Sequence, residues 1–227
     1  MDRSTARSTI YNILSLCFTY PEEKVCSWIL EGKWIEEIKE ALILLTEGGF
    51  EKNLQTMRDS LKGEREDISL ELAREYTRLF INAFPHVVAP PYGSVYMEKD
   101  GLVFGKFTSA VLGFYHETGF TLKEDLHDLP DHIAHELEFM GILTGQEAGT
   151  SRSEKVKLEE TQMDFFSRFI LPWVPSFCQK LLEQSRSSFY RNLGDLTREF
   201  IQMEKNYLGV SEETNSQNSI EAEIRGG

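Results

Sequence analysis

The stretch D-I-S-L-E-L-A-R-E-Y-T-R-L-F-I-N-A, residues 67–83, decides the fold class because its pattern is helical throughout. Apolar residues recur three or four positions apart, at Leu72, Tyr76, Leu79, Phe80 and Ala83. The other face carries charges that can pair one turn apart: Glu71, Arg74, Glu75 and Arg78. We therefore predict an amphipathic helix here, with one face buried in a core.

The same periodicity extends outward in both directions along the chain. It predicts a first helix from a cap at Ser4 or Thr5 to about Phe18, and then helices at about 22–31, 33–46, 50–61, 106–118, 130–147, 152–170, 176–185 and 187–206. The breaks fall at proline and glycine, which interrupt helices. The prediction is an all-α, single-domain helical bundle over residues 1–206, with a long ordered central loop. Residues 207–227 form an acidic tail that is poor in large apolar groups, so we expect it to be disordered.

Composition excludes several classes of protein. The formal net charge of -13 among 227 residues disfavours binding to nucleic acid or anionic membranes and favours a basic partner. The three cysteines, Cys17, Cys26 and Cys178, have no C-x-x-C spacing, so neither a disulfide framework nor a zinc ribbon is indicated. No apolar run is long enough to span a bilayer.

The segment 84–105 interrupts the helical pattern with prolines and glycines but contains four aromatic residues, Phe84, Tyr92, Tyr96 and Phe104. Solvated linkers are poor in aromatics, so the segment is expected to be an ordered loop with a function. A small hairpin about Lys99-Asp100-Gly101 is one possible arrangement, with residues 95–97 opposite 102–104. Within it, P-P-Y-G-S-V-Y, residues 90–96, offers two tyrosines of the kind enriched in binding sites, although buried core tyrosines would give the same pattern.

A second motif, L-P-D-H-I-A-H-E-L-E-F-M, spans residues 129–140. Asp131 and His132 stand at the expected start of a helix, where Asp131 could receive a cationic group and His132 could change charge near neutral pH. Alternatively, Asp131 only supports the helix N-terminus and His132 pairs with Glu136. A metal site of His132, His135 and Glu136 is a third reading, but the histidines are three residues apart rather than the four of zinc proteases.

Recognised catalytic and cofactor motifs are missing from the sequence. It contains no P-loop, no dinucleotide-binding glycine pattern and no nucleophile elbow. We expect no enzyme activity and no cofactor, and no phosphate-binding motif supports nucleotide binding.

Three motifs in order, E-Y-T-R-L-F (residues 75–80), P-P-Y-G-S-V-Y (90–96) and P-D-H-I-A-H-E-L-E-F-M (130–140), resemble the TorD/DmsD family of redox-enzyme maturation chaperones. The resemblance covers about residues 7–205, and the central third is the diagnostic part. It implies an all-α cytoplasmic chaperone that binds the twin-arginine leader of the catalytic subunit of a molybdopterin reductase. Such a chaperone holds the apo subunit back from export until its cofactor is inserted.

Carried over to this chain, the resemblance implies a leader-binding surface of Leu79, Phe80, Pro90, Tyr92, Ser94, Tyr96, Asp131 and His132, supported by Glu75, Tyr76 and Glu136. Relatives often carry tryptophans near the loop, whereas here the tryptophans are Trp28, Trp34 and Trp173. Two other functions stay open: a metal-dependent hydrolase using His132, His135 and Glu136, and a helical adaptor with no leader peptide client. A monomer and a domain-swapped homodimer are equally compatible with the sequence.

Overall fold

The computed structural model describes residues 1–46, 48–84, 86–99, 101, 103–122 and 128–210, and within these the regular elements are helices. The α-helices are α1 (Arg3–Cys17), α2 (Glu23–Glu31), α3 (Lys33–Leu45), α4 (Glu51–Ser60), α5 (Arg65–Tyr76), α6 (Gly93–Met97), α7 (Lys106–Glu117), α8 (Ile133–Gln146), α9 (Arg152–Phe165), α10 (Val174–Gln184) and α11 (Ser188–Tyr207). The described part of the chain contains no strand, only one isolated antiparallel bridge between Tyr92 and His132. The all-α prediction is confirmed.

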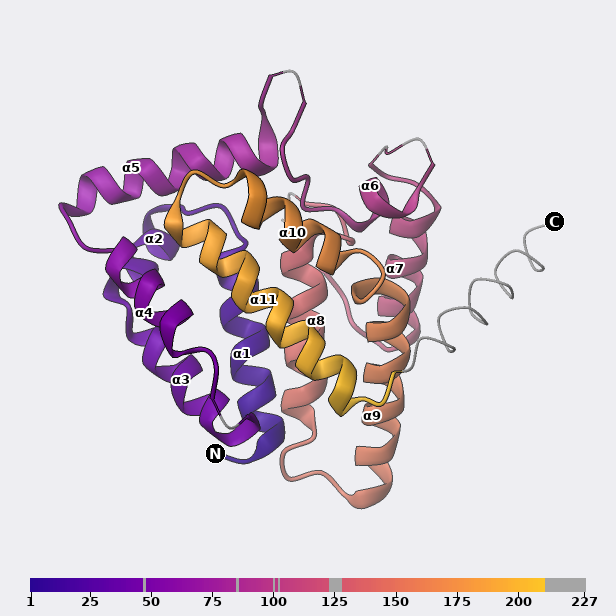
Figure 1. Ribbon diagram of the computed structural model, residues 1–227. Coiled ribbons are helices and arrows are strands. Elements are labelled where there is room, and N and C mark those ends of the chain that lie inside the picture. Colours follow the sequence, from indigo (N-terminus) through magenta and orange to yellow (C-terminus); the bar gives the residue numbers. More distant parts are fainter. Residues whose placement is uncertain (47, 85, 100, 102, 123–127, 211–227) are drawn as a thin grey trace.

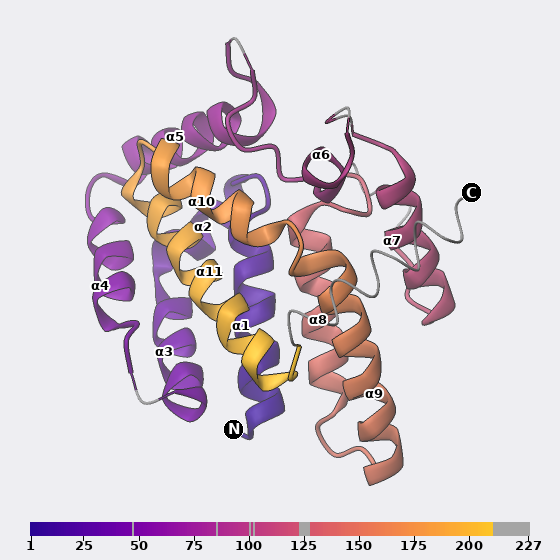
Figure 2. The same cartoon turned by 45° about the vertical axis from the view of Figure 1, so that its right-hand side comes forward.

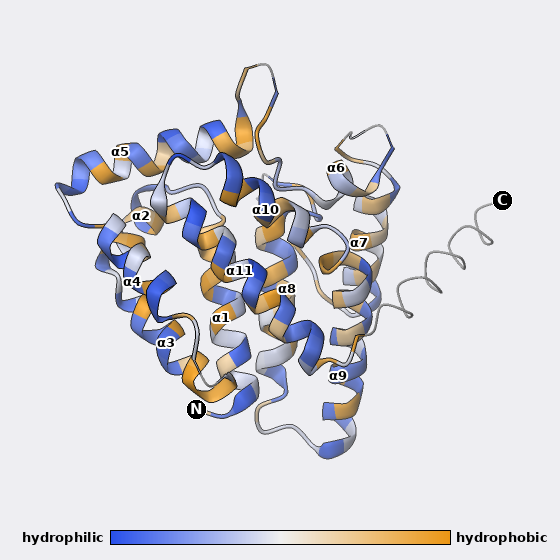
Figure 3. Ribbon diagram, in the orientation of Figure 1, coloured by the Kyte–Doolittle hydropathy of each residue, from blue (hydrophilic) through white to orange (hydrophobic). Residues whose placement is uncertain are grey.

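Helix α1 runs through the centre of the bundle and packs against α3, α8 and α11. Figures 1 and 2 show α8 beside it, with α9 and α7 on the outer side of α8. Figure 3 shows hydrophilic residues on the outward faces of α5, α9 and α11, as burial of the apolar faces requires. The first helix begins slightly before the predicted cap, because the Asp2 side chain accepts the Thr5 N–H at 2.8 Å.

Two long predicted helices end in a wider π-helical turn. After α5 the segment Thr77–Ile81 (η1) is π-helical, and after α9 so is Phe166–Ile170 (η2). The Asn82 and Leu171 N–H groups donate to the Thr77 and Phe166 carbonyls, at 2.8 and 2.9 Å, which is the π-helical spacing. The π-turn η1 carries Leu79 and Phe80 into the core, where they are 0% and 4% exposed.

The hairpin considered for the central segment is wrong. Residues 95–97 belong to α6, a short helix that packs against α7, while 100 and 102 lie outside the described residues. Gly93 begins this helix. A side chain there would overlap the Phe107 ring and lie 3.0 Å from Trp173 Nε1, so the position requires a glycine because of close packing.

The packed part of the chain extends slightly beyond residue 206. The Arg7 guanidinium lies over the Tyr207 ring, 4.3 Å from its centroid, and Val210 is 6% exposed. The predicted tail therefore begins no earlier than residue 211, and 211–227 lie outside the described residues. The three cysteines are free and buried. No helix in the described ranges is long and apolar enough to cross a membrane.

Candidate functional site

The loop motif and the helix-start motif meet at the N-terminal end of α8. The Gly93 N–H donates to the Asp131 carbonyl and the Ile133 N–H donates to the Pro91 carbonyl, both at 2.9 Å. These two bonds form the Tyr92–His132 bridge. Figures 1 and 2 show α6 held at this end of α8 as a result.

Asp131 is fully buried at this junction. One carboxylate oxygen, Oδ2, accepts the Ser94 N–H at 2.8 Å, which ties the start of α6 to the start of α8. The other oxygen, Oδ1, is buried without a hydrogen-bond partner. Since an unpaired buried carboxylate oxygen is costly, Asp131 is both a structural tie and an unused acceptor.

His132 is the N-cap of α8 rather than an exposed switch. Its Nδ1 accepts the Ala134 N–H at 3.1 Å, so Nδ1 carries no proton and the ring proton sits on Nε2. Burial lowers the pKa of His132 to about 4, assisted by the neighbouring His135 and opposed by Asp128. The expected charge change near neutral pH is therefore wrong, because the buried ring is neutral there. The alternative pairing with Glu136 is also absent from the interactions of the described residues.

The metal-site reading does not fit the donor set. Ligand atoms of Asp128, His132 and His135 lie within 4.8 Å of one another, but Glu136 is not part of this group. A metal on His132 Nε2 would move the ring proton to Nδ1, where it would face the Ala134 N–H. The imidazole that caps α8 is therefore unsuited to bind a metal, and Asp128 is instead engaged by the Tyr92 hydroxyl at 2.8 Å.

Glu136 points in a different direction, toward the C-terminal half of the chain. Its Oε2 lies 3.1 Å from the Trp173 indole N–H, which also donates to the Phe169 carbonyl at 2.6 Å, and its Oε1 is buried without a partner. Burial, and then the neighbouring charge of Asp131, raise the pKa of Glu136 well above its ordinary value. Burial in the free protein thus favours the neutral acid form of Glu136.

Trp173 is the site residue that sequence reasoning missed. It is fully buried next to the loop, with its ring 5.3 Å from the Tyr96 ring and its Nε1 beside Gly93. The only sequence signal was its position between Pro172 and Pro175, which does not indicate the loop as a neighbour. A tryptophan therefore does lie at the loop, but it comes from the other half of the sequence.

The predicted surface residues divide into two groups. Leu79 and Phe80 lie in the core, where the Phe80 ring contacts Phe177 and Tyr190, so they support the junction and do not form its surface. Ser94, Asp131 and His132 are also buried. Pro90, Tyr92 and Tyr96 are partly exposed. Leu79 and Phe80 were predicted at the binding surface because an apolar helix face has the same sequence pattern whether the protein core or a partner covers it.

The predicted supporting residues have defined contacts. Tyr76 donates its hydroxyl to the Phe18 carbonyl at 3.0 Å. Glu75 accepts the Arg186 N–H at 2.6 Å and the Arg78 guanidinium at 2.7 Å, which joins α5 to the start of α11. Burial opposes the charge of Glu75, but these bonds keep its pKa below the ordinary value.

Unpartnered buried polar atoms collect around this junction. Six of the nine found in the described residues belong to it or to the adjoining α6, α7 and α8: Ser94 Oγ, Tyr96 hydroxyl, Thr108 Oγ1, Asp131 Oδ1, His135 Nε2 and Glu136 Oε1. Native proteins leave few such atoms, so their concentration at one place marks the junction as a candidate binding site.

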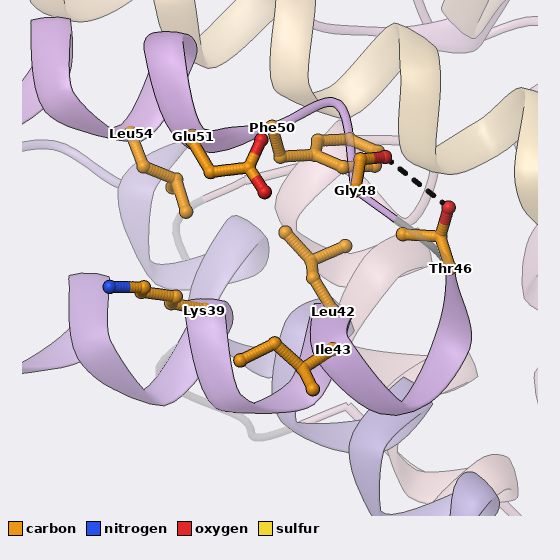
Figure 4. A pocket seen from close by; sticks show the side chains of 8 residues that line it. All are labelled: Lys39, Leu42, Ile43, Thr46, Gly48, Phe50, Glu51 and Leu54. Atoms are coloured by element: carbon orange, nitrogen blue, oxygen red, sulfur yellow. Dashed lines mark hydrogen bonds between the residues drawn. The ribbon is translucent and has the colours of Figure 1, made fainter.

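A surface hollow of about 280 Å³ lies elsewhere, between α3 and α4. Figure 4 shows Leu42, Phe50 and Leu54 lining it, with Thr46 bonded to the Gly48 carbonyl at its edge. Among the described residues that line it, there is no group of converging buried polar atoms and no motif residue. We assign the candidate site to the α6–α8 junction.

Comparison with known proteins agrees with the motifs. Residues 46–179 match the family model described as nitrate reductase delta subunit. The chain is 31% identical over 147 residues to the chaperone protein TorD of Vibrio vulnificus (strain YJ016), covering 64% of this chain and 67% of that protein. It is 32% identical to the chaperone protein TorD of Photobacterium profundum, covering 63% of this chain and 67% of that protein.

A solved structure is also similar. The crystal structure of an Archaeoglobus fulgidus protein assigned to redox enzyme maturation superimposes with a TM-score of 0.53 at 26% identity. The match covers 86% of this chain and 93% of that one. The similarity therefore extends well beyond the diagnostic central third.

Proposed function

The chain belongs to the nitrate reductase delta subunit family, which includes the TorD chaperones, and from this premise we propose that it binds the twin-arginine leader of a molybdopterin reductase. The family consists of chaperones in molybdoenzyme maturation and not of catalysts. The finer steps proposed for this chain are leader binding, retention of the apo catalytic subunit until cofactor insertion, and action in the cytoplasm.

One observation supports leader binding most directly, namely the free Oδ1 of Asp131. A guanidinium group is a strong donor to a carboxylate, and its bond is strengthened in a buried site. In the free protein the Ser94 N–H occupies only Oδ2, at 2.8 Å, so the second oxygen is available to a client arginine. Access requires the start of α6 to move.

The apolar part of a leader has suitable contacts nearby. Phe84, which follows η1, is 99% exposed, and Phe104, which precedes α7, is 75% exposed. Exposed aromatic side chains of this kind are common binding anchors. We propose that these side chains contact the apolar run that follows the two arginines.

The test is calorimetric titration of a synthetic peptide with two adjacent arginines followed by an apolar run, and of its two-lysine counterpart. We expect micromolar or tighter binding of the first and much weaker binding of the second, because lysine cannot bind a carboxylate in bidentate fashion. Absence of any binding of the arginine peptide at micromolar concentration would refute the proposal.

The variant Asp131→Asn tests the site itself. The asparagine keeps an oxygen for the Ser94 N–H and removes the charge, so the fold is expected to survive while leader affinity falls about tenfold or more. The matched control is Asp59→Asn on α4, where the carboxylate is half exposed and paired with Lys62. If the two variants bind the arginine peptide with equal affinity, Asp131 is not part of the binding site.

A further inference from the structure

Two buried carboxyl groups lie near the start of α6, Asp131 at Ser94 and Glu136 at the Trp173 indole that packs on Gly93. Asp131 binds the Ser94 N–H directly. Glu136 binds the Trp173 indole N–H, and the indole nitrogen lies 3.0 Å from the place where a Gly93 side chain would begin. Both carboxyl groups are therefore close to the backbone of α6, Asp131 in direct contact and Glu136 through the indole.

Each of these carboxyl groups has one satisfied and one unsatisfied oxygen. Asp131 Oδ1 and Glu136 Oε1 are both buried without partners, and so is the Ser94 hydroxyl at the start of α6. The described residues supply no donor to Asp131 Oδ1. In the neutral acid form of Glu136 they supply no acceptor for the proton that Oε1 carries, because Oε2 accepts the Trp173 N–H. A client guanidinium, with five N–H donors, would pair with Asp131 Oδ1 and, once the Glu136 proton has left, with Glu136 Oε1.

The charges around Glu136 explain why it is neutral without a client. The titratable groups facing it are Asp131, at the start of its own helix, and Tyr115 on α7. Asp131 repels a second negative charge, and burial raises the pKa of Tyr115 so that it stays neutral. No cation among the described interactions of Glu136 offsets this repulsion.

We propose that Glu136 is the second carboxyl group of the leader site, neutral in the free protein, and that it releases its proton to solvent when a client guanidinium binds. This inference rests on the proposed function and adds a regulation to it, since leader binding becomes coupled to pH. The Trp173 N–H, which Oε2 shares with the Phe169 carbonyl, then stabilises the carboxylate that forms.

The direction of the pH dependence of leader affinity follows because the carboxylate form of Glu136, and not the neutral acid, binds the guanidinium. Below the raised pKa of Glu136 the proton must leave before the guanidinium is fully paired, so binding is weaker at lower pH. Affinity for the arginine peptide should rise with pH, by up to about tenfold per pH unit while Glu136 titrates.

The experiment measures proton release by calorimetry. The arginine peptide is titrated into the full-length protein at one pH in two buffers with different ionisation enthalpies, such as phosphate and Tris. We expect the wild type to release about one proton per complex. Glu136→Gln, which mimics the neutral acid, should release none and bind about tenfold more weakly at about pH 8. Glu138→Gln changes an exposed glutamate two residues further along α8. It should release as many protons, and bind as tightly, as the wild type.

The outcomes separate this inference from the proposed function. If the wild type binds the arginine peptide with no proton exchange, and Glu136→Gln binds equally well, the inference is overturned and leader binding stands. If the wild type does not bind, both fail. Should Glu136→Gln not fold, the wild-type proton count and pH dependence alone decide, because a pH-independent affinity contradicts the inference.

Discussion

The two ends of α8 each bury carboxyl groups, but among the described residues only the C-terminal end places cations against them. At the C-terminal end, Glu147 joins a network with Arg7 and Glu204 that ties α1 to α11. At the N-terminal end, Asp131 and Glu136 each keep an oxygen with no partner. A helix of 14 residues separates them by about 20 Å.

The C-terminal network is nearly closed. The Arg7 guanidinium donates to both oxygens of Glu204, at 2.6 to 3.1 Å, and to Glu147 at 3.3 Å, and the Tyr11 hydroxyl also donates to Glu204 at 2.8 Å. Although burial disfavours its charge, the bonds to Glu204 raise the pKa of Arg7 above the ordinary value. The remaining Glu147 oxygen, Oε2, accepts no hydrogen bond but forms an ion pair with the Lys155 ammonium at 3.4 Å.

The contrast indicates how to distinguish a structural from a functional buried polar cluster. Partnered charges hold helices together, and stability is lost when a member is removed. Unpartnered acceptors cost stability in the free protein and recover it only when a ligand supplies donors. Substitutions at the two ends of α8 should therefore separate folding from binding.

The largest expected effect is that of Arg7→Ala at the C-terminal end. Removing the guanidinium leaves Glu204 and Glu147 buried without their cation, so the free energy of unfolding should fall by about 3–5 kcal/mol. Urea denaturation followed by circular dichroism measures this change. The control, Lys33→Ala, breaks an exposed pair with Glu31 and should cost less than about 1 kcal/mol. If Arg7→Ala lowers the free energy of unfolding no more than Lys33→Ala does, the C-terminal network is not a structural cluster and the contrast between the two ends fails.

At the N-terminal end of α8, burial of His132 should make the free energy of unfolding depend on pH. His132 has a pKa of about 4 in the fold and an ordinary value of about 6.5 when unfolded. Above about pH 6.5 His132 is neutral in both states, and its contribution to the free energy of unfolding is fully present. As pH falls from about 6.5 to about 4, only the unfolded chain takes up the proton, so that contribution is lost. This linkage should remove about 3 kcal/mol of stability over that interval.

The variant His132→Asn keeps an N-cap and cannot titrate, so its stability should fall less steeply between about pH 6.5 and 4. The measurement is a set of urea unfolding curves across this range. His116→Asn, on the exposed side of α7, should retain the wild-type slope. Identical slopes for all three proteins would show that the His132 ring is not kept neutral by burial.

Sequence reasoning predicted the helices well and the burial of polar groups poorly. Periodicity is a local signal, and it placed α2, α3, α4 and α7 to α11 within a few residues because each apolar face meets the core. The two motifs that meet at the α6–α8 junction were also identified. Nothing local, however, distinguishes the buried Arg7 from exposed arginines, since its partners Glu147 and Glu204 lie far along the chain.

The composition of the candidate site was only partly predictable for the same reason. Asp131, His132, Tyr92 and Tyr96 stood out as residue types in a motif, whereas Trp173 enters through packing between distant segments. The neutral state of His132 and Glu136 depends on burial, which a sequence does not report. Both π-turns lie at a helix end, and the apolar periodicity does not distinguish them from α-helix.

The smallest expected effect concerns the fit of α6 over the two carboxyl groups. In Gly93→Ala the new methyl group would overlap the Phe107 ring and press on the Trp173 indole, so α6 must shift and stability should fall by about 1–3 kcal/mol. In Gly113→Ala, inside α7, the methyl group meets no atom within 4 Å and stability should rise by about 0.5–1 kcal/mol. Thermal unfolding of the pair measures the difference. Because the shift in α6 would partly uncover Asp131 and Glu136, Gly93→Ala should also bind the arginine peptide faster than Gly113→Ala. Slower or equal association would show that α6 does not cover the site, even if the stability loss is as expected.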